Sequence, residues 1–212
     1  MATKRTGTKG QQTRQRIVAE AAPIFNQRGY EGSSLTDLMR ATGLEKGGIY
    51  RHFSSKEELA AEAFDYTWAE ARQARLPEID AGAGSIAWLK QLIANFIERK
   101  APVAGGCPLL NTAIEADDGN PILRERVNKA LRAWIAQLQT VVADGQSRGE
   151  VRRDVDPKQV AAVIIAALEG GLMMSRLERS HDTLRTVQDH LNHYLDTDVA
   201  HERHARVRKR SL

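Results

Sequence analysis

Apolar residues recur at the spacing of an α-helix along almost the whole chain, and this periodicity constrains the fold most strongly. Ile17, Ala21 and Phe25 lie four residues apart, and Val18 and Ala22 widen the same stripe. Residues at this spacing share one face of a helix and turn it toward a core. Runs in which apolar and polar residues alternate between turn signals, as strands require, are missing. The sequence therefore predicts an all-α fold.

Capping residues and helix breakers divide the chain into successive helices. Gly29 is expected to end the first helix, and Pro23 inside it is expected to kink it. Ser55, followed three residues later by Glu58, has the pattern of a capping box at the start of a helix running to about residue 75. The other predicted helices cover about 34–42, 44–53, 84–100, 108–117, 121–148, 157–179 and 182–196.

Composition excludes several classes of protein. The 212 residues are 42% hydrophobic and 27% charged, which is typical of globular proteins. No apolar run approaches the roughly 20 residues that a membrane-spanning helix needs, and the amino terminus shows no secretory signal. The single cysteine, Cys107, forms no internal disulfide and fits a reducing compartment. These features predict a cytoplasmic protein with no membrane partner.

Charge is distributed unevenly along the chain. Residues 1–60 contain ten Lys or Arg and six Asp or Glu, residues 61–200 contain sixteen and twenty, and residues 201–212 contain five and one. An acidic body between basic ends favours a polyanionic partner. A solvated flexible tail explains the basic ends equally well, so charge alone leaves both interpretations open.

The stretch LEKGGIYRHF, residues 44–53, places two adjacent glycines inside a predicted helix. Each glycine costs about 1 kcal/mol relative to alanine in a helix interior, so a short helix with two of them is marginal alone. Ile49 and Phe53 share one face of this helix, and the opposite face carries the glycines with Tyr50 and Arg51. A bare, cationic outer face suits close approach to a polyanion. The preceding helix and its glycine turn complete a helix-turn-helix pattern, whose second helix enters the major groove.

The run TRQRIVAEAAPIFNQRGYEGSSLTDLMRATGLEKGGIYRHFSSKEELAAEAF resembles the DNA-binding domain of TetR-family transcriptional regulators. The resemblance covers about fifty residues in order, and the remaining helices are similar in layout to the family's ligand-binding and dimerisation domain. It implies a flexible basic arm at 1–10, a three-helix DNA-binding domain at 11–57 and a helical domain at 58–197 joined by a connecting helix. Residues 198–212 are then expected to be a disordered basic tail.

The resemblance and the helix geometry together assign roles to the predicted DNA-binding residues. By resemblance, the phosphate contacts come from Lys46, Tyr50, His52 and Lys56. Ser33 and Ser34, at the start of the second helix, are expected to offer hydroxyls and backbone N–H groups to another phosphate. Thr36 and Arg51 are the predicted base readers, because arginine can donate two hydrogen bonds to guanine. Gly47 and Gly48 would let the backbone approach the groove floor. Tyr50 as a packing residue and His52 as a surface residue remain the structural alternatives.

The body of the protein carries a predicted effector pocket and a cysteine of interest. The pocket candidates lie on helices that line the pocket in similar regulators, and they are Phe64, Trp68, Trp88, Phe96, Cys107 and Trp134. Core packing explains most of these aromatics equally well. Cys107 precedes Pro108 at a helix amino terminus, which can lower a thiol's pKa, so sensing of oxidants or electrophiles is an alternative function. Simple packing at the turn is favoured over sensing.

The helix at 157–179 is apolar on nearly every side, which requires burial all round, partly by a second copy of the chain. The predicted homodimer interface consists of Ala161, Ile164, Ile165, Leu168, Gly171, Leu172 and Leu191. A dimer would match two helix-turn-helix units to a palindromic operator.

The sequence thus predicts a dimeric DNA-binding regulator, most simply a repressor released from double-stranded DNA by a small-molecule effector. A sequence-tolerant architectural DNA binder is a further alternative, and repressor and activator are not separated by sequence. The chain has no phosphate-binding glycine loop and no ordered nucleophile and base, so an enzyme is not expected. His190 and His193 have a spacing compatible with metal but no third ligand, so neither metal nor cofactor is predicted.

Overall fold

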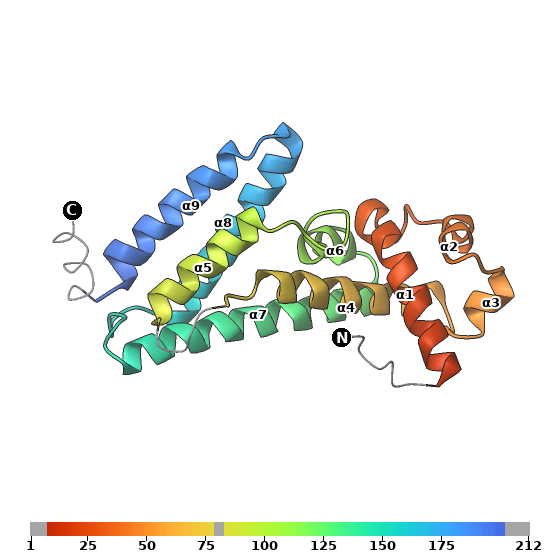
Figure 1. Ribbon diagram of the computed structural model, residues 1–212, viewed down its shortest axis with the longest axis horizontal. Coiled ribbons are helices and arrows are strands. Elements are labelled where there is room, and N and C mark those ends of the chain that lie inside the picture. Colours follow the sequence, from red (N-terminus) through yellow and green to blue (C-terminus); the bar gives the residue numbers. More distant parts are fainter. Residues whose placement is uncertain (1–7, 79–82, 202–212) are drawn as a thin grey trace. The chain divides into compact units, whose positions relative to one another are not determined.

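A computed structural model describes residues 8–78 and 83–201, and these residues form nine α-helices and one short π-helix. The helices are α1 (Lys9–Arg28), α2 (Leu35–Thr42), α3 (Lys46–Tyr50), α4 (Lys56–Arg75), α5 (Ser85–Glu98), α6 (Pro108–Ala116), α7 (Pro121–Ser147), α8 (Pro157–Glu178), α9 (Asp182–Tyr194) and the π-helix η1 (Leu195–Val199) (Figure 1). Within the described residues the only β-pairing is one antiparallel bridge, between Val151 and Ala200. The predicted all-α fold is confirmed.

Most predicted helix boundaries agree with the structure, and two details differ. The third helix is only five residues long, Lys46–Tyr50, and the side chain of its N-cap residue Glu45 makes no capping hydrogen bond. The helix is short because each glycine disfavours helical structure and no side chain caps its first N–H groups. The first helix begins after its Thr8 cap, so residues 9 and 10 of the predicted flexible arm are helical, and it ends before Gly29 as predicted with Pro23 inside it.

The chain divides into two compact units. Unit 1 comprises the residues up to Gln73 together with Ala101–Ala130, and unit 2 comprises Ala74–Lys100 together with the residues from Leu131 onward. The long helices α4 and α7 each pass from unit 1 into unit 2, because the unit boundaries fall within them. The effector domain predicted from sequence is therefore divided between the two units.

The core of unit 1 holds the first helices together. Its fully buried side chains include Ile17 of α1, Leu38 of α2 and Ile49 of α3, with Phe53 just after α3. Burying an aliphatic or aromatic side chain contributes about 1.5–3 kcal/mol. Ile49 and Phe53 therefore fix α3 in place although the helix is too short to be stable alone.

In unit 2, α9 contacts both α8 and α5, and these three helices run alongside one another (Figure 1). Leu89 and Ile93 of α5 and Ile164 of α8 are among its fully buried residues. After η1 the chain returns to the end of α7. There the Arg152 N–H donates to the Val199 carbonyl (3.0 Å) and the His201 N–H to the Glu150 carbonyl (2.8 Å). The predicted tail therefore begins inside the fold, and its residues 202–212 lie outside the described part.

Candidate nucleic-acid interface

The helices α2 and α3 form a helix-turn-helix whose outer surface carries most of the predicted DNA-binding residues. α2 ends at Gly43, which adopts the left-handed conformation (φ 63°) that favours glycine and turns the chain toward α3. With Ile49 and Phe53 turned into the core, the opposite side of α3 faces solvent. Lys46, Gly47 and Tyr50 of α3 are exposed, as are Arg51 just after it and Thr36 of α2, and His52 is half-buried.

The two glycines of α3 have different surroundings. A Cβ built on Gly47 would meet no atom within 4 Å, whereas one built on Gly48 would lie 3.3 Å from the Leu44 Cβ. Gly47 is therefore the bare position of the outer surface. Gly48 is turned partly toward the α2–α3 connection, so its lack of a side chain also serves packing within the domain.

The two serines before α2 do not offer the surface predicted for them. Ser33 is fully buried, and its hydroxyl donates to the Gly29 carbonyl (2.5 Å). The Ser34 N–H and hydroxyl both donate to the Asp37 carboxylate, at 3.3 and 2.6 Å. The Ser34 hydroxyl, followed by the Arg28 guanidinium, lowers the pKa of Asp37, so a carboxylate occupies this helix terminus. The prediction of a phosphate contact is wrong for Ser33, and at Ser34 the groups proposed as donors already have an acceptor.

Lys56 is also engaged within the protein. Its Nζ donates to the Tyr30 carbonyl (2.6 Å) and lies 4.2 Å from the centre of the Tyr30 ring. The same tyrosine donates its hydroxyl to the Glu57 carboxylate. Lys56 thus ties the first turn of α4 to the segment between α1 and α2.

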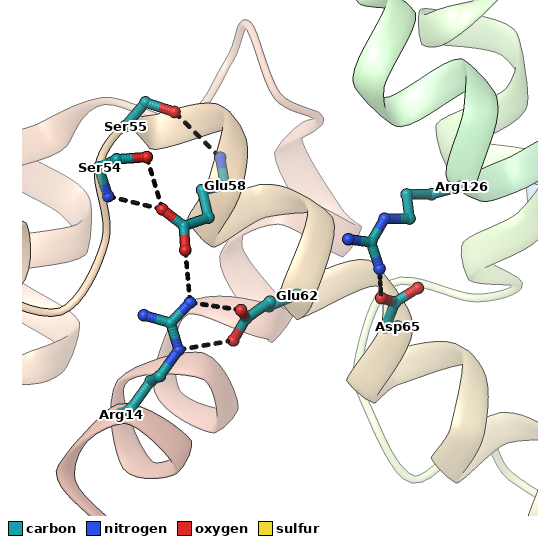
Figure 2. Close-up of polar contacts among 7 residues, drawn as sticks. All are labelled: Arg14, Ser54, Ser55, Glu58, Glu62, Asp65 and Arg126. Atoms are coloured by element: carbon teal, nitrogen blue, oxygen red, sulfur yellow. Dashed lines mark hydrogen bonds and ion pairs between the residues drawn. The ribbon is translucent and has the colours of Figure 1, made fainter. Parts of the chain in front are cut away.

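A polar cluster joins α1 to the start of α4 (Figure 2). The Arg14 guanidinium donates to Glu58 (2.6 Å) and to Glu62, and lies 4.1 Å from the centre of the Phe53 ring. Of the two hydrogen bonds in the predicted capping box, the structure contains one. Glu58 N–H donates to the Ser55 hydroxyl (3.2 Å), but the Glu58 carboxylate accepts from the hydroxyl and N–H of Ser54, both at 2.6 Å. These bonds from Ser54, and then Arg14, lower the pKa of Glu58 to about 2.

The carboxyl end of α1 is held by α6 within unit 1. The Asn111 amide donates to the Asn26 carbonyl (2.9 Å) and side-chain oxygen (3.1 Å), and the buried Asn26 amide donates to the Ala104 and Gly106 carbonyls. The Glu115 carboxylate accepts from the N–H groups of Tyr30 (2.6 Å) and Glu31 (2.7 Å). The helix before the helix-turn-helix is therefore fastened at this end by side chains that the sequence did not single out.

Two family profiles match the sequence that builds this arrangement. The profile described as "Bacterial regulatory proteins, tetR family" matches residues 17–63, and that described as "Tetracyclin repressor-like, C-terminal domain" matches residues 85–191. The chain belongs to the TetR family. It is accordingly a helix-turn-helix DNA-binding transcriptional regulator, and the family's members are not enzymes.

Individual relatives extend the likeness to nearly the whole chain. A TetR transcriptional regulator from Chloroflexus aurantiacus J-10-FL, known from a crystal structure, is 44% identical with a TM-score of 0.84, covering 91% of this chain and 98% of that one. The HTH-type transcriptional repressor DhaR of Mycobacterium sp. (strain GP1) is 27% identical over 81% of this chain and 86% of its own. A regulator from Saccharomonospora viridis, solved in complex with choline, shares the fold with a TM-score of 0.76 at 21% identity, over 90% of this chain and 98% of that one.

The residues predicted to line the effector pocket of this TetR-family chain lie in both units. In unit 2 the rings of Phe96 and Trp134 stack with centroids 6.2 Å apart, and Trp88 is half-buried. In unit 1 Phe64 and Trp68 are buried, and Phe64 borders a cavity of about 20 Å³, which has room for about one water molecule. That cavity is too small for an effector.

The sulfur of Cys107 is protected from solvent at the start of α6. The residue is 1% exposed, and its side chain makes no capping hydrogen bond to the helix. Burial raises the barrier to attack by an oxidant or electrophile, since reactive cysteines need access as well as thiolate character. The observation favours the packing interpretation of this residue.

The predicted dimer residues on α8 and α9 belong to the core of the protomer. Leu172 is partly exposed, while the other six are buried within the chain, namely Ala161, Ile164, Ile165, Leu168, Gly171 and Leu191. A Cβ on Gly171 would lie 3.0 Å from the Val187 Cγ2 of α9. The protomer itself therefore covers six of the residues that were predicted to form the dimer interface.

The other face of α8 is apolar and largely exposed. Val163, Ala166, Gly170, Met173 and Leu177 follow one another at spacings of three and four residues, and we call them the α8 stripe. Leu177 is 79% exposed, and a Cβ on Gly170 would meet nothing within 4 Å. By length and composition α8 is long and apolar enough to cross a membrane, contrary to the sequence prediction. The core helix of a soluble protein meets the same criterion, and 44% of the most apolar window of α8 is buried within the protein.

Proposed function

We propose that this TetR-family protein is a homodimeric repressor that leaves a palindromic operator when a small-molecule effector binds. The observation that carries the proposal is the outer face of α3, where Gly47 leaves the backbone bare between exposed Lys46 and Arg51. A helix-turn-helix presents such a face to the major groove. The relative DhaR is named a repressor, which favours repression over activation.

The predicted DNA-binding residues on this surface divide into two roles. Arg51 and Thr36 are the proposed base readers, with Arg51 donating to guanine O6 and N7. Lys46, Tyr50 and His52 are the proposed phosphate contacts, and the Lys46 Nζ lies 6.0 Å from the Tyr50 ring centre, so the two can serve one stretch of backbone. The different roles predict different dependence on DNA sequence and on salt.

The α8 stripe supports the dimer. Its spacing of three and four residues is that of a seam between packed helices, and a monomer would leave this continuous apolar face in water. A second copy presenting the same stripe would cover it, since a two-fold interface uses the same surface on both subunits. A dimer would bring two α3 helices to the two half-sites of a palindrome.

Effector release requires the ligand to favour one of two protein shapes. The continuity of α4 and α7 across the two units provides a covalent route by which an event in unit 2 changes unit 1. The S. viridis regulator was solved in complex with choline, so a protein of this fold accommodates a small ligand. We place the protein in the cytoplasm, where the operator would be.

Selection of bound fragments from a random DNA pool tests the proposal. A dimer with two major-groove helices should enrich an inverted repeat whose half-site centres lie about 10 bp or a multiple apart. Binding to all sequences with a steep salt dependence would instead identify an architectural DNA binder. A single enriched half-site without a repeat would contradict the dimer.

A further inference from the structure

Arg75 is a buried arginine in unit 2 that the sequence did not single out. It is the last residue of α4 and is 7% exposed. Its Nε–H has no hydrogen-bond acceptor, and no ion pair involves Arg75 among the described residues. A guanidinium in this position is unusual, because buried charges in proteins are normally paired.

Two consecutive residues of α5 hold this arginine in place. The Asn95 amide donates to the Arg75 and Leu76 carbonyls, both at 3.2 Å, and fixes the backbone. The ring of Phe96 lies beneath the guanidinium, 4.1 Å from its central carbon, and stacks in turn on Trp134. The guanidinium is therefore preorganised rather than loosely accommodated.

The contacts of Arg75 leave its buried Nε–H without a hydrogen-bond acceptor. Arginine is positively charged, and the Nε–H of Arg75 is shielded from water without an acceptor. A cation–π contact recovers only part of the free energy that burying an unpaired charge costs. Stacking on Phe96 also uses only the face of the guanidinium. The N–H donors at its edge remain suited to a planar acceptor with two oxygens.

We propose that Arg75 is the anion-recognising residue of the effector site, and that the effector is a small organic monocarboxylate with an apolar or aromatic body. The carboxylate would accept two hydrogen bonds from the guanidinium edge, and Phe96 and Trp134 would contact the apolar part. A monoanion neutralises one guanidinium, whereas a phosphate dianion would leave a net buried charge. The inference rests on the proposed effector response, since Arg75 ends the helix whose first turn follows the helix-turn-helix.

Calorimetry on the DNA-free protein tests the site directly. The probes are hexanoate, octanoate, benzoate and phenylacetate, each compared with its neutral amide. At least one carboxylate should bind the wild-type protein more tightly than its amide by about 10- to 100-fold, the effect of a charged hydrogen-bonded pair. If no carboxylate in this series is preferred over its amide, the proposal is overturned.

Three variants locate the binding. Arg75→Met keeps the length of the side chain and should abolish the preference for carboxylate over amide. Arg75→Lys keeps the positive charge but loses the planar pair of N–H donors, so it should retain part of the preference for carboxylate over amide. If Arg75→Met does not fold, a preference in Arg75→Lys as large as in the wild type would refute the assignment. Arg185→Met is the matched control, because Arg185 pairs at the surface with Asp182 (3.1 Å) and should leave binding unchanged. Wild-type carboxylate affinity in Arg75→Met would refute the assignment.

Release of operator DNA is measured separately by fluorescence anisotropy, so that the two proposals fail differently. Carboxylate binding that depends on Arg75 without DNA release would support the site and contradict effector release as the function. DNA release by the amides as strongly as by the carboxylates, unaffected by Arg75→Met, would support effector release and overturn the role of Arg75.

Discussion

The adjacent glycines of α8 offer a matched test of the dimer, because one faces the protomer core and the other faces solvent. Gly170→Arg and Gly171→Arg introduce the same side chain one position apart. At Gly171 even a Cβ would lie 3.0 Å from Val187 Cγ2 and 3.4 Å from Leu184 Cδ2, whereas at Gly170 it would meet nothing within 4 Å. We expect Gly171→Arg to destroy the protomer fold and Gly170→Arg to leave it intact.

The magnitude of the effect at Gly170 follows from two-fold symmetry. Each dimer would bury two arginines within the apolar α8 stripe, and an uncompensated buried charge costs about 3–5 kcal/mol. The pair therefore weakens association by about 6–10 kcal/mol, which is at least about 10⁴-fold in the dimer dissociation constant. Within the protomer, replacing glycine in a helix contributes up to about 1 kcal/mol of stability, so the thermal midpoint of a monomer should not suffer from the substitution itself.

Sedimentation at a series of concentrations measures the dissociation constant, and circular dichroism reports the helical fold. Gly170→Arg should be a helical monomer at concentrations where the wild-type protein is a dimer, and it should bind a single half-site weakly. A dimer of wild-type affinity in this variant would show that the α8 stripe is not the interface. A folded, dimeric Gly171→Arg protein would refute the argument from the Val187 contact.

Three further predictions concern the DNA-binding domain. Gly47→Leu should keep wild-type stability and lose at least about tenfold in operator affinity by gel shift, whereas Gly48→Leu should also lower the melting temperature because its side chain would meet Leu44. Unchanged operator affinity in Gly47→Leu would contradict the placement of α3 in the groove. Arg51→Ala should weaken binding to the preferred site by about 1–3 kcal/mol and relax specificity at one base pair, whereas Lys46→Ala should weaken binding to all DNA sequences and reduce the salt dependence of log K by about one per half-site. Equal losses of affinity on all sequences for Arg51→Ala would make Arg51 a phosphate contact. Because the pKa of Glu58 is lowered from 4.5 to about 2, its carboxylate stabilises the fold fully above pH 4.5, and this stabilisation is lost as the pH falls toward about 2. Glu58→Gln should therefore flatten the dependence of the unfolding free energy on pH in that window, and an unchanged profile would contradict the assignment.

Much of the DNA-binding domain was predictable because its information is local. Helix periodicity, the glycine turn at Gly43 and the inward face of Ile49 and Phe53 depend on residues close in sequence, and the structure confirms each of them. The fate of Ser33 was not predictable in the same way. Its burial depends on the return of the chain at Gly29, whose carbonyl accepts the serine hydroxyl, and the pattern of a capping serine looks the same in either case.

Helix periodicity did not predict which face of α8 is buried within the protomer. A helix that is apolar all round has no polar face to set its orientation, so the sequence of α8 does not say which side meets α9. Tertiary packing decides it: Gly171 lies against α9, where an added Cβ would be 3.0 Å from Val187 Cγ2, and Gly170 is turned outward. Arg75 was missed for a related reason. An arginine at a helix end is ordinarily exposed, and its burial follows from the position of Phe96 on α5 rather than from any local pattern.

The segment between α1 and α2 is where the body of the protein can act on the DNA-binding helices. Tyr30 receives contacts from two helices at once: Glu115 of α6 accepts from its N–H, Lys56 of α4 donates to its carbonyl, and Glu57 accepts from its hydroxyl. A displacement of α4 or α6 must therefore either break these bonds or carry the start of α2 with it. Because Ser33 and Ser34 follow within four residues, the orientation of α2 depends directly on this attachment. A DNA phosphate would compete with the Tyr30 carbonyl for the Lys56 ammonium, so a contact between Lys56 and DNA would weaken the bond to Tyr30.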